Sequence, residues 1–393
     1  MKKTNTLPAG VKKAVGPEVF VFLTLFVGLF VLLGSEMGLA NMFNTMMNTA
    51  YALLLDTVFY ILAIAVLAGA ISGLFAEFGV IALFNKLLSP VVRVVYGLPG
   101  ASAVGIFTTY LSDNPAILTL AGDNNFRRYF KKYQLPALTN IGTAFGMGLI
   151  ITTFMVGLKS PVGESFGLAV LMGNLGAIVG SIVSTRLMLR ATAKLYGKEE
   201  PCDVTEEENP IDITKYRQVR PGSVGTRFID ALLSGGKNGV DMGLSIIPGV
   251  LIICTLVLML TNSPSTTGYT GSAYEGIGLL PWLGDKLQFI LMPLFGFTSS
   301  EAIAVPITAL GAAGAAIGIV ENLVAGGLAG SHDIAVFTAM CICWSGYLST
   351  HVAMMDTLKC SHLTGKAILC HTIGGLCAGV AANWGYRILL LLL

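Results

Sequence analysis

The sequence predicts an all-α polytopic membrane protein with about seven transmembrane helices and two re-entrant helical hairpins, arranged as inverted repeats. Of its 393 residues, 54% are hydrophobic and only 12% are charged, whereas a soluble domain carries about 25% charged residues. Apolar runs of about 20 residues, the length that spans a bilayer, recur along the chain. Their order is repeated on either side of a charged segment, residues 191–227. This composition excludes an ordinary soluble enzyme and a disordered chain.

Seven runs are long and apolar enough to be transmembrane helices. They are residues 17–36, 55–77, 135–158, 166–189, 243–261, 333–356 and 366–390. Lys and Arg residues are in excess on the cytoplasmic side of a membrane. With the N-terminus placed inside, 21 of the 24 Lys and Arg residues lie on that side, and the C-terminus lies outside. We therefore expect a protein of the bacterial plasma (inner) membrane in this orientation.

Two further apolar stretches are each interrupted in the middle. Residues 97–122 are broken by Ser112-Asp113-Asn114-Pro115, and residues 296–322 by Gly311-Ala312-Ala313-Gly314. Each half has about 12 residues, too few to cross a bilayer. Non-helical backbone at membrane depth is tolerated where it is buried in protein or lines a cavity. Both stretches are therefore predicted to be re-entrant hairpins.

The spans and hairpins divide the chain into two halves with the same order of elements. We expect an N-terminal helix and interfacial segment in residues 1–54, a first repeat in 55–190, a charged cytoplasmic linker in 191–227 and a second repeat in 228–393. The Lys and Arg distribution starts the two repeats on opposite sides, so the repeats are inverted. Inverted repeats with discontinuous helices are typical of secondary transporters, whose substrate and ion sites lie near the bilayer midplane.

The interruption of the first hairpin places the carboxylate of Asp113 between Ser112 and Asn114. A carboxylate at membrane depth is costly and by default marks an ion or substrate path. The alternative is that Asp113 caps the second half-helix, with Pro115 in its first turn. Capping and a role in binding are compatible, so the tip of this hairpin is a candidate site.

Polar residues also open the second hairpin and interrupt two of the predicted spans. Ser300 and Glu301 offer oxygen atoms for a cation, a proton or substrate hydroxyls, and helix capping is the alternative. The polar residues of the two spans are Thr139, Asn140 and Thr143 in 135–158, and Ser345, Ser349 and His351 in 333–356. Asn140 needs hydrogen-bonding partners inside a membrane. These residues are expected opposite the two hairpin tips.

All four histidines and five of the seven cysteines lie between residues 332 and 377. This concentration leaves a metal site of His351, Cys360 and His362 as an alternative, although the paired ligand spacings of zinc motifs are absent. A chance cluster is the commoner explanation. The sequence contains no nucleotide-binding loop, so we expect no cofactor and coupling to a cation, sodium or proton. No nucleophile–base pair indicates an enzyme.

Two short motifs resemble the nucleoside-recognition (Gate) superfamily of membrane proteins. Gly97-Leu98-Pro99-Gly100 and Asn114-Pro115-Ala116-Ile117 are similar to elements in the membrane domain of ferrous-iron transporters, and the order of elements over residues 55–390 looks like the core of concentrative nucleoside transporters. The resemblance implies a nucleoside-transporter-like fold and a homo-oligomer, by analogy a trimer. It also implies substrate contacts from Ser112, Asp113, Asn114, Asn140, Ser300, Glu301, Ser345, Ser349 and His351, and ion coupling by Ser112, Asp113, Thr139 and Thr143.

The sequence also departs from both families. The Asn-Glu signature of the nucleoside transporters is missing from residues 135–158, and the cysteine that follows the hairpin in the iron transporters is absent, with Asp113 near its place. The fold therefore transfers better than the substrate.

The sequence thus predicts a secondary active transporter that moves a small polar solute, of which a nucleoside is one candidate, by ion-coupled alternating access. Its partners would be that solute and the lipid bilayer, with no nucleic acid. Two alternatives stay open at this point: a divalent metal-ion permease, and a membrane subunit of an exporter or regulatory complex.

Overall fold

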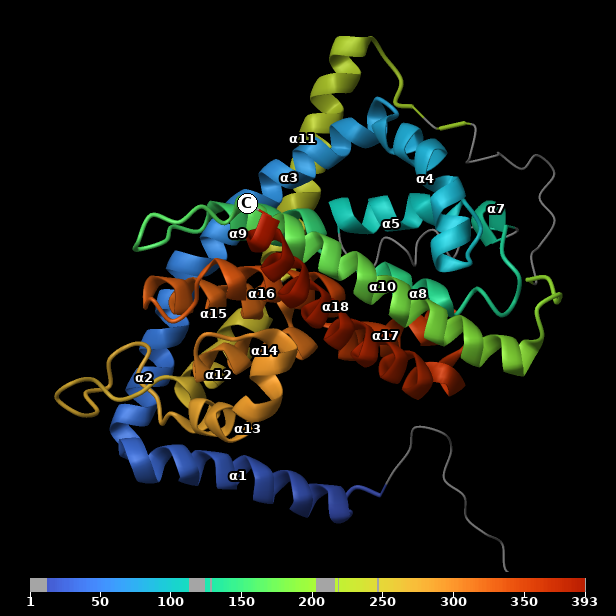
Figure 1. The fold of residues 1–393 in the computed structure, drawn as a ribbon. Helices are drawn as coiled ribbons and strands as arrows, with labels where there is room; N and C mark the ends of the chain where they lie inside the picture. Colours follow the sequence, from blue (N-terminus) through green and yellow to red (C-terminus); the bar gives the residue numbers. More distant parts are fainter. Residues whose placement is uncertain are drawn as a thin grey trace, which may run out of the picture.

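The computed structural model describes residues 13–112, 124–127, 129–202, 216–217, 219–245 and 247–392. Every regular element in this part of the chain is helical, apart from two isolated β-bridges. The helices assemble into one packed body, and the long helix α1 (Pro17–Met37) runs along its edge (Figure 1). The side chains of α1 are mostly exposed and apolar, as expected of a helix that faces lipid.

Five helical stretches are long and apolar enough to cross a membrane, and a pair of helices bent by 76° is a sixth candidate. The five are α1, Leu39–Glu77 (α2, Leu39–Ala52; η1, Leu53–Val58; α3, Phe59–Glu77), Ala137–Gly157 (α8, Ala137–Thr143; α9, Gly148–Gly157), Gly167–Tyr196 (α10) and Ser361–Leu392 (η4, Ser361–Leu363; α18, Thr364–Leu392). The bent pair is α13 (Leu279–Phe295) with η3 (Ser300–Ile303) and α14 (Ala304–Gly311). The protein is therefore an all-helical membrane protein, with fewer uninterrupted spans than the seven expected.

Two of the expected spans are interrupted, which accounts for the lower number. The stretch 243–261 is divided among the end of α11 (Val224–Ser245), η2 (Gly249–Cys254) and α12 (Thr255–Thr261). The stretch 333–356 is divided into α16 (Ser331–Trp344) and α17 (Tyr347–Thr357). At that division Ser345 and Gly346 have φ angles of 37° and 68°, a left-handed conformation that ends a right-handed helix. A hydropathy profile averages over neighbouring residues and does not detect such a change of backbone angles.

The second predicted hairpin contains a break at the expected place. Helix α14 ends at Gly311, Ala312 is extended, and α15 (Ala313–Ala325) follows and packs against α14. In the first predicted hairpin, α5 (Ser102–Leu111) ends at Ser112. Asp113, Asn114 and the rest of that hairpin up to residue 122 lie outside the described residues. The short helix α7 (Asn124–Arg127) comes next.

Helices α4 (Val80–Tyr96) and α13 occupy corresponding positions ahead of the two predicted hairpins. Each has 17 residues and a proline in its C-terminal half. Each lies between two glycines with positive φ, Gly79 and Gly97 for α4 and Gly278 and Gly296 for α13. The corresponding glycines are 199 positions apart. The two halves of the chain therefore build the same local structure from different sequences.

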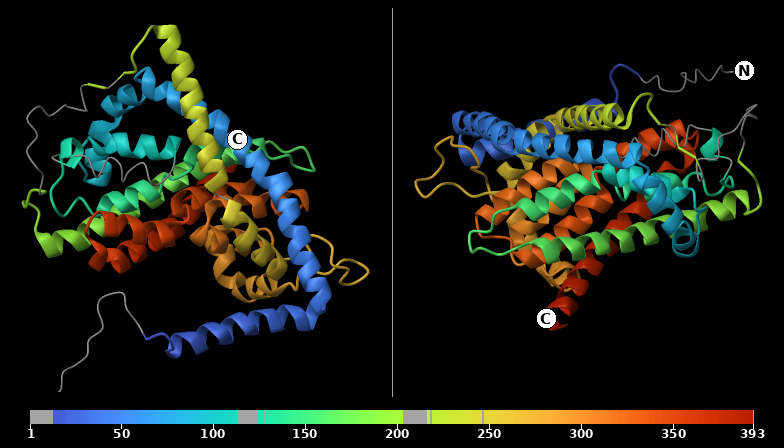
Figure 2. Two further views of the ribbon diagram at one scale, coloured as in Figure 1. Left: turned by 180° about the vertical axis from the view of Figure 1, so that it is seen from behind. Right: turned by 90° about the horizontal axis from the view of Figure 1, so that it is seen from above.

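The centre of the molecule is a bundle of α10, α16 and α18 (Figures 1 and 2). Helix α16 is buried from Asp333 to Trp344. Helices α10 and α18 approach closely because small residues face each other. A Cβ atom on Gly180 would lie 2.6 Å from the Cβ of Ala378, closer than van der Waals contact. Small residues at such crossings are the usual means of packing helices inside a membrane.

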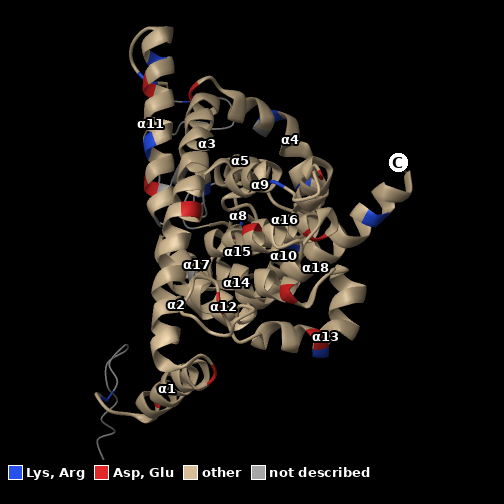
Figure 3. Ribbon diagram, turned by 90° about the vertical axis from the view of Figure 1, so that its left-hand side faces the viewer, with Lys and Arg blue, Asp and Glu red and all other residues tan. Residues whose placement is uncertain are grey.

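A second unit, the α3–α11 pair, lies at one side of this bundle (Figure 2). Figure 3 shows acidic and basic residues alternating along α11, among them Arg227, Asp230, Lys237 and Asp241. Helix α3 is strongly apolar, so the pair combines one lipid-compatible helix with one that carries a polar face. That polar face contributes to the cavity described next.

Candidate functional site

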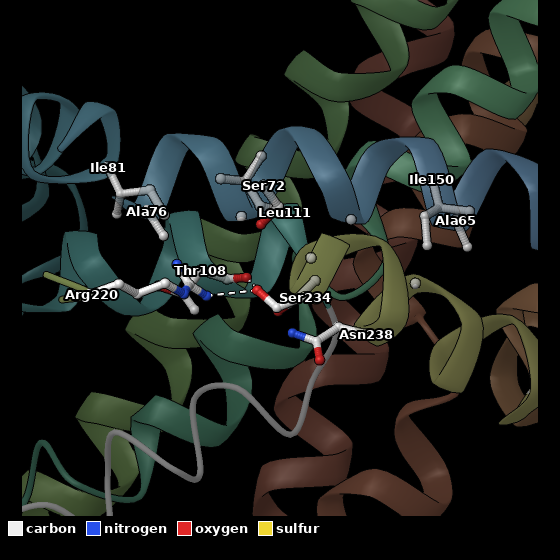
Figure 4. A pocket seen from close by; sticks show the side chains of 15 residues that line it. Ala65, Ser72, Ala76, Ile81, Thr108, Leu111, Ile150, Arg220, Ser234 and Asn238 are labelled. Carbon is white, nitrogen blue, oxygen red and sulfur yellow. Dashed lines mark hydrogen bonds between the residues drawn. The ribbon is translucent and has the colours of Figure 1, made fainter. Parts of the chain in front are cut away.

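A cavity of about 250 Å³ lies between the α3–α11 pair on one side and α5 and α9 on the other (Figure 4). Its position between two packed units is typical of ligand sites in membrane transporters. The lining residues are Ala65, Gly69, Ser72, Gly73, Ala76, Ile81, Thr108, Leu111, Ser112, Ile150, Arg220, Ser234, Gly235, Asn238 and Gly239.

The cavity combines an apolar wall with several polar groups. Two hydroxyls of α5 and its end are bonded to their own backbone: Ser112 Oγ donates to the Thr108 carbonyl at 2.6 Å, and Thr108 Oγ1 to the Val104 carbonyl at 2.7 Å. From the other side, Ser234 and Asn238 of α11 face the same space (Figure 4). The amide of Asn238 both donates and accepts hydrogen bonds, so this wall can bind a polar solute.

One end of the cavity carries the guanidinium group of Arg220. The Glu77 carboxylate at the end of α3 accepts hydrogen bonds from Arg220 Nη1 at 2.8 Å and from Arg227 Nε at 2.7 Å. Arg220 Nη2 also donates to Ser234 Oγ at 2.7 Å. A guanidinium group at this end favours solutes that carry hydrogen-bond acceptors or a negative charge.

The apolar wall of the cavity is largely backbone, because α3 and α11 touch through glycines. A Cβ atom on Gly239 would lie 2.6 Å from Val66 Cα and even closer to the Ala65 carbonyl oxygen. A Cβ atom on Gly69 would lie 3.1 Å from the Gly239 nitrogen. Larger residues at these positions would force the helices apart. The shape of the cavity thus depends on this glycine contact.

The break between α8 and α9 and the break between α16 and α17 meet each other in the interior. Between α8 and α9, Met147 has a φ of 56°. Ser345, at the α16–α17 break, donates from its Oγ to the carbonyl of Gly146 at 3.0 Å. Gly346 N–H donates to the Ala309 carbonyl of α14 at 3.0 Å. Unwound backbone is therefore buried and bonded within the protein, as required at membrane depth.

A buried polar network lies beside these breaks. Asn140 Nδ2 donates to Ser184 Oγ at 2.9 Å and to the Ala367 carbonyl at 3.0 Å. Ser184 Oγ lies 2.9 Å from His371 Nδ1, and His371 Nε2 lies 2.7 Å from the Cys343 carbonyl. Because a carbonyl only accepts, His371 carries a proton on Nε2, and in the neutral ring Nδ1 accepts from Ser184. Four helices are joined by this chain of bonds.

Known membrane proteins have a similar arrangement of helices. No protein-family model and no curated protein matches the sequence. The solved structures that match it include three of CNTnw: a doubly substituted variant in an outward-facing state, the protein in an inward-facing substrate-bound state, and a singly substituted variant in an intermediate state. The TM-scores are 0.53, 0.53 and 0.54, with 13% sequence identity in each case, covering 93% of this chain and 84%, 84% and 85% of the CNTnw chains.

The chain has the fold of a concentrative nucleoside transporter. The resemblance drawn from the sequence is therefore confirmed at the level of the fold. The matches cover nearly the whole chain in outward-facing, inward-facing and intermediate states alike. At 13% identity these matches establish the fold alone.

Within this nucleoside-transporter fold, the predicted site residues fall into three places. Ser112 lines the cavity between α3–α11 and α5–α9. Ser300 and Glu301 lie in η3 beside α13, with Ser300 Oγ 3.4 Å from Glu301 Oε2, and do not line this cavity. The third group lies in or beside the buried network at the helix breaks and comprises Thr139, Asn140, Thr143, Ser345 and His351, with Ser349 on the same helix as His351.

Two methionines of α17 face the predicted ion-coupling hydroxyls. Thr139 Oγ1 lies 3.3 Å from Met355 Sδ, and Thr143 Oγ1 lies 3.6 Å from Met354 Sδ. Thr143 Oγ1 also donates to the Thr139 carbonyl at 2.8 Å. In this packed state both hydroxyls therefore point toward soft sulfur atoms, which are poor ligands for sodium.

The residues of the alternative metal site do not form a cluster. His351 is fully buried on α17, whereas His362 Nε2 lies 3.0 Å from the Tyr196 hydroxyl and is exposed. Cys360 lines a separate pocket with Arg127 and Lys132, among others. Within the described residues, no group of three or more His, Cys, Asp or Glu side chains is placed to hold a metal ion.

The sequence did not point to the cavity residues Arg220, Ser234 and Asn238, nor to Glu77, which pairs with Arg220. These residues come from segments that read as a span end, a charged linker and the start of the second repeat. Glu77 was the one available signal, because an acidic residue at the end of an apolar span needs a partner. Its partners Arg220 and Arg227 lie more than a hundred positions away, which no local pattern reveals.

Proposed function

We propose that the protein is an ion-coupled secondary transporter that moves a small polar solute across the membrane by alternating access. The observation that carries this proposal is the cavity between the α3–α11 pair and the ends of α5 and α9, in a nucleoside-transporter fold with two broken spans. Broken helices close to a substrate site are typical of secondary transporters. A volume of about 250 Å³ suits a small solute and lies below the range of drug-sized ligand sites.

The moving part would comprise the broken helices α8–α9 and α16–α17 with the hairpin helices α5, α14 and α15. The α3–α11 pair would serve as the fixed wall, because its glycine contact and the Glu77 ion pairs hold it together. Displacement of α5 and α9 along this wall would open the cavity to each side in turn. Inverted repeats support such symmetry, and the matched helices α4 and α13 are consistent with them.

The solute class follows from the cavity lining. Hydroxyl, amide and guanidinium groups bind oxygen and nitrogen acceptors, so a nucleoside or another polyhydroxylated solute is the candidate. The coupling ion would be sodium or a proton, held near Ser112 and Asp113 or at Thr139 and Thr143. We further propose a bacterial inner-membrane protein with a cytoplasmic N-terminus, and a trimer by analogy with the nucleoside transporters.

The first test is ligand-dependent stabilisation of the purified protein. A ligand that binds the folded state at a hundredfold excess over its dissociation constant stabilises it by about 2.7 kcal/mol. We expect a shift in the unfolding midpoint with a polar organic solute, increased by sodium or by a change in pH. A shift with divalent metals alone would favour the metal permease instead.

The site itself is tested by two neighbouring substitutions on α11. Asn238→Ala removes a polar group that lines the cavity, and we expect at least a tenfold weaker affinity, the value of one good hydrogen bond of about 1.4 kcal/mol. Lys237→Ala is the matched control, because Lys237 is exposed and is not among the lining residues. Equal affinities in the two variants would place the solute elsewhere.

Ion coupling is tested at Asp113, which the sequence places at the tip of the first hairpin. We expect Asp113→Asn to abolish coupled uptake while leaving the unfolding midpoint within a few degrees of the wild-type value, because amide and carboxylate have the same shape. Wild-type uptake by this variant would exclude Asp113 from the coupling site.

A further inference from the structure

The side chain of His351 is fully buried and unsatisfied. It has no exposed surface, and among the described residues neither Nδ1 nor Nε2 makes a hydrogen bond. The carbonyl of Tyr347, one turn earlier on α17, lies nearby without meeting hydrogen-bond geometry. A buried polar group without a partner is rare in native proteins and calls for a specific explanation.

The surroundings of His351 contain few ionisable groups. Its ring centroid lies 4.6 Å from that of His371 on α18 and 5.5 Å from that of Tyr347 on its own helix. Of the other elements that pack against α17, α8 and α14 contain no ionisable residue. The third, η4, contributes only His362, which is exposed and lies 3.0 Å from the Tyr196 hydroxyl. Among the described residues, no carboxylate is a ring neighbour of His351 that could stabilise a charged imidazole, so His351 is neutral in this packed state.

The neighbouring histidine, in contrast, is fully bonded. His371 bridges Ser184 and the Cys343 carbonyl, so both of its ring nitrogens are occupied. A second proton on His371 would break the bond from Ser184, whereas a proton on His351 breaks none. His351 is therefore the available basic nitrogen of this pair.

Helix α17 is also the part of the broken span that can move. Its partner α16 is enclosed between α10 and α18, whereas α17 lies at the surface, with Leu348 40% and Val352 54% exposed. The positive φ angles of Ser345 and Gly346 form a hinge between the two helices. A tilt of α17 about this hinge would bring His351 out of the packed interior.

We propose that His351 is the proton-binding site of the transport cycle, empty in this packed state and occupied when α17 moves outward. A proton binds a ring nitrogen directly and does not require a cavity around it. Among the described residues, neither ring nitrogen of His351 has a hydrogen-bonding partner, so the unprotonated nitrogen is available to accept a proton. Binding transfers one proton from a hydronium ion to an imidazole lone pair, so that an N–H bond forms, the O–H bond of the hydronium ion breaks and a water molecule is left. The inference rests on the proposed transport function only in naming that proton as the coupling ion.

The test is hydrogen–deuterium exchange of residues 347–357 in lipid nanodiscs at several pH values, corrected for intrinsic exchange. If opening of α17 takes up one proton, its opening equilibrium rises tenfold per pH unit below about 6.5, the ordinary imidazole value. We expect this slope in the wild type and in His362→Gln, whose histidine is exposed. We expect a flat response in His351→Gln, and in His351→Leu should the first variant fold poorly.

Two results would overturn the proposal. One is an α17 exchange rate in the wild type that does not change with pH. The other is a slope that persists in a folded His351 variant or disappears in His371→Gln alone, which would assign the proton to His371. The measurement requires no solute, so its outcome is separate from that of the uptake experiments. A pH-dependent opening without uptake of any solute would leave the proton site intact and refute the transporter.

Discussion

The contact between α3 and α11 allows a sharp test, because neighbouring glycines of one helix have different surroundings. Gly239 faces α3, and a Cβ atom there would lie 2.6 Å from Val66 Cα and closer still to the Ala65 carbonyl oxygen. Gly236 is also buried, but its nearest neighbour would be Val66 Cγ1 at 3.6 Å, an ordinary van der Waals distance. Replacing each with alanine adds the same methyl group to the same helix.

The expected energies have opposite signs. Alanine is better than glycine in a helix by about 0.8–1 kcal/mol, and this gain applies at both positions. At Gly239 the methyl group must displace backbone by about 1 Å to reach normal contact, and overpacking of this kind costs about 1–3 kcal/mol. Gly236→Ala should therefore be neutral or stabilising, and Gly239→Ala destabilising by up to about 2 kcal/mol. The separation of α3 and α11 in the second variant also widens the cavity.

Thermal unfolding of both variants and the wild type in the same detergent measures this difference. The order of unfolding midpoints should be Gly236→Ala at or above the wild type and Gly239→Ala below it. Should Gly239→Ala be as stable as Gly236→Ala, the two helices do not touch there, and the wall of the proposed site is placed incorrectly.

Three further predictions concern the helix breaks and a loop outside the membrane spans. Ser345→Ala removes the hydrogen bond between the two breaks and should cost about 1 kcal/mol of stability, measured by thermal unfolding. Asn140→Ala strips the buried network of its donor and should cost about 1–3 kcal/mol in the same assay, with an unchanged midpoint contradicting the network. Burial raises the pKa of Glu275, but hydrogen bonds from Thr270 and Gly271 outweigh it and hold that pKa below its ordinary value. Its stabilisation is therefore present above about pH 4.3 and lost as the pH falls through the lowered value, so the midpoints of wild type and Glu275→Gln should converge in acid.

Much of the fold could be predicted from the sequence, because apolar spans and helix breaks depend on residues that are close together in the chain. Polar or glycine-rich interruptions of apolar stretches mark the helix breaks at Ser345 and Ala312, where the structure has them. The number of spans was overestimated because hydropathy adds residues across a break without registering backbone angles. Residues 333–356 illustrate this: the sequence predicts one span there, although the φ of 37° at Ser345 ends α16 within them.

The candidate site could be predicted only in part from the sequence, because its residues come from segments that are far apart in the chain. Ser112 could be identified from its place in an interrupted apolar stretch. Arg220 and Asn238 could not, since their role depends on packing of α11 against α3, which begins 165 positions earlier in the chain. In a sequence, an arginine in a linker normally indicates only the orientation of the protein in the membrane. That Arg220 pairs with Glu77 is seen only in the structure.

Solute accumulation by proteoliposomes tests the central claim most directly. Vesicles containing the purified protein are given an inward sodium or proton gradient and a panel of labelled nucleosides and other small polar solutes. Alternating access coupled to an ion predicts accumulation of at least one solute above its equilibrium level, lost when the gradient is collapsed and reduced in Asn238→Ala but not in Lys237→Ala. Equal inside and outside concentrations of every solute under both gradients would contradict the account.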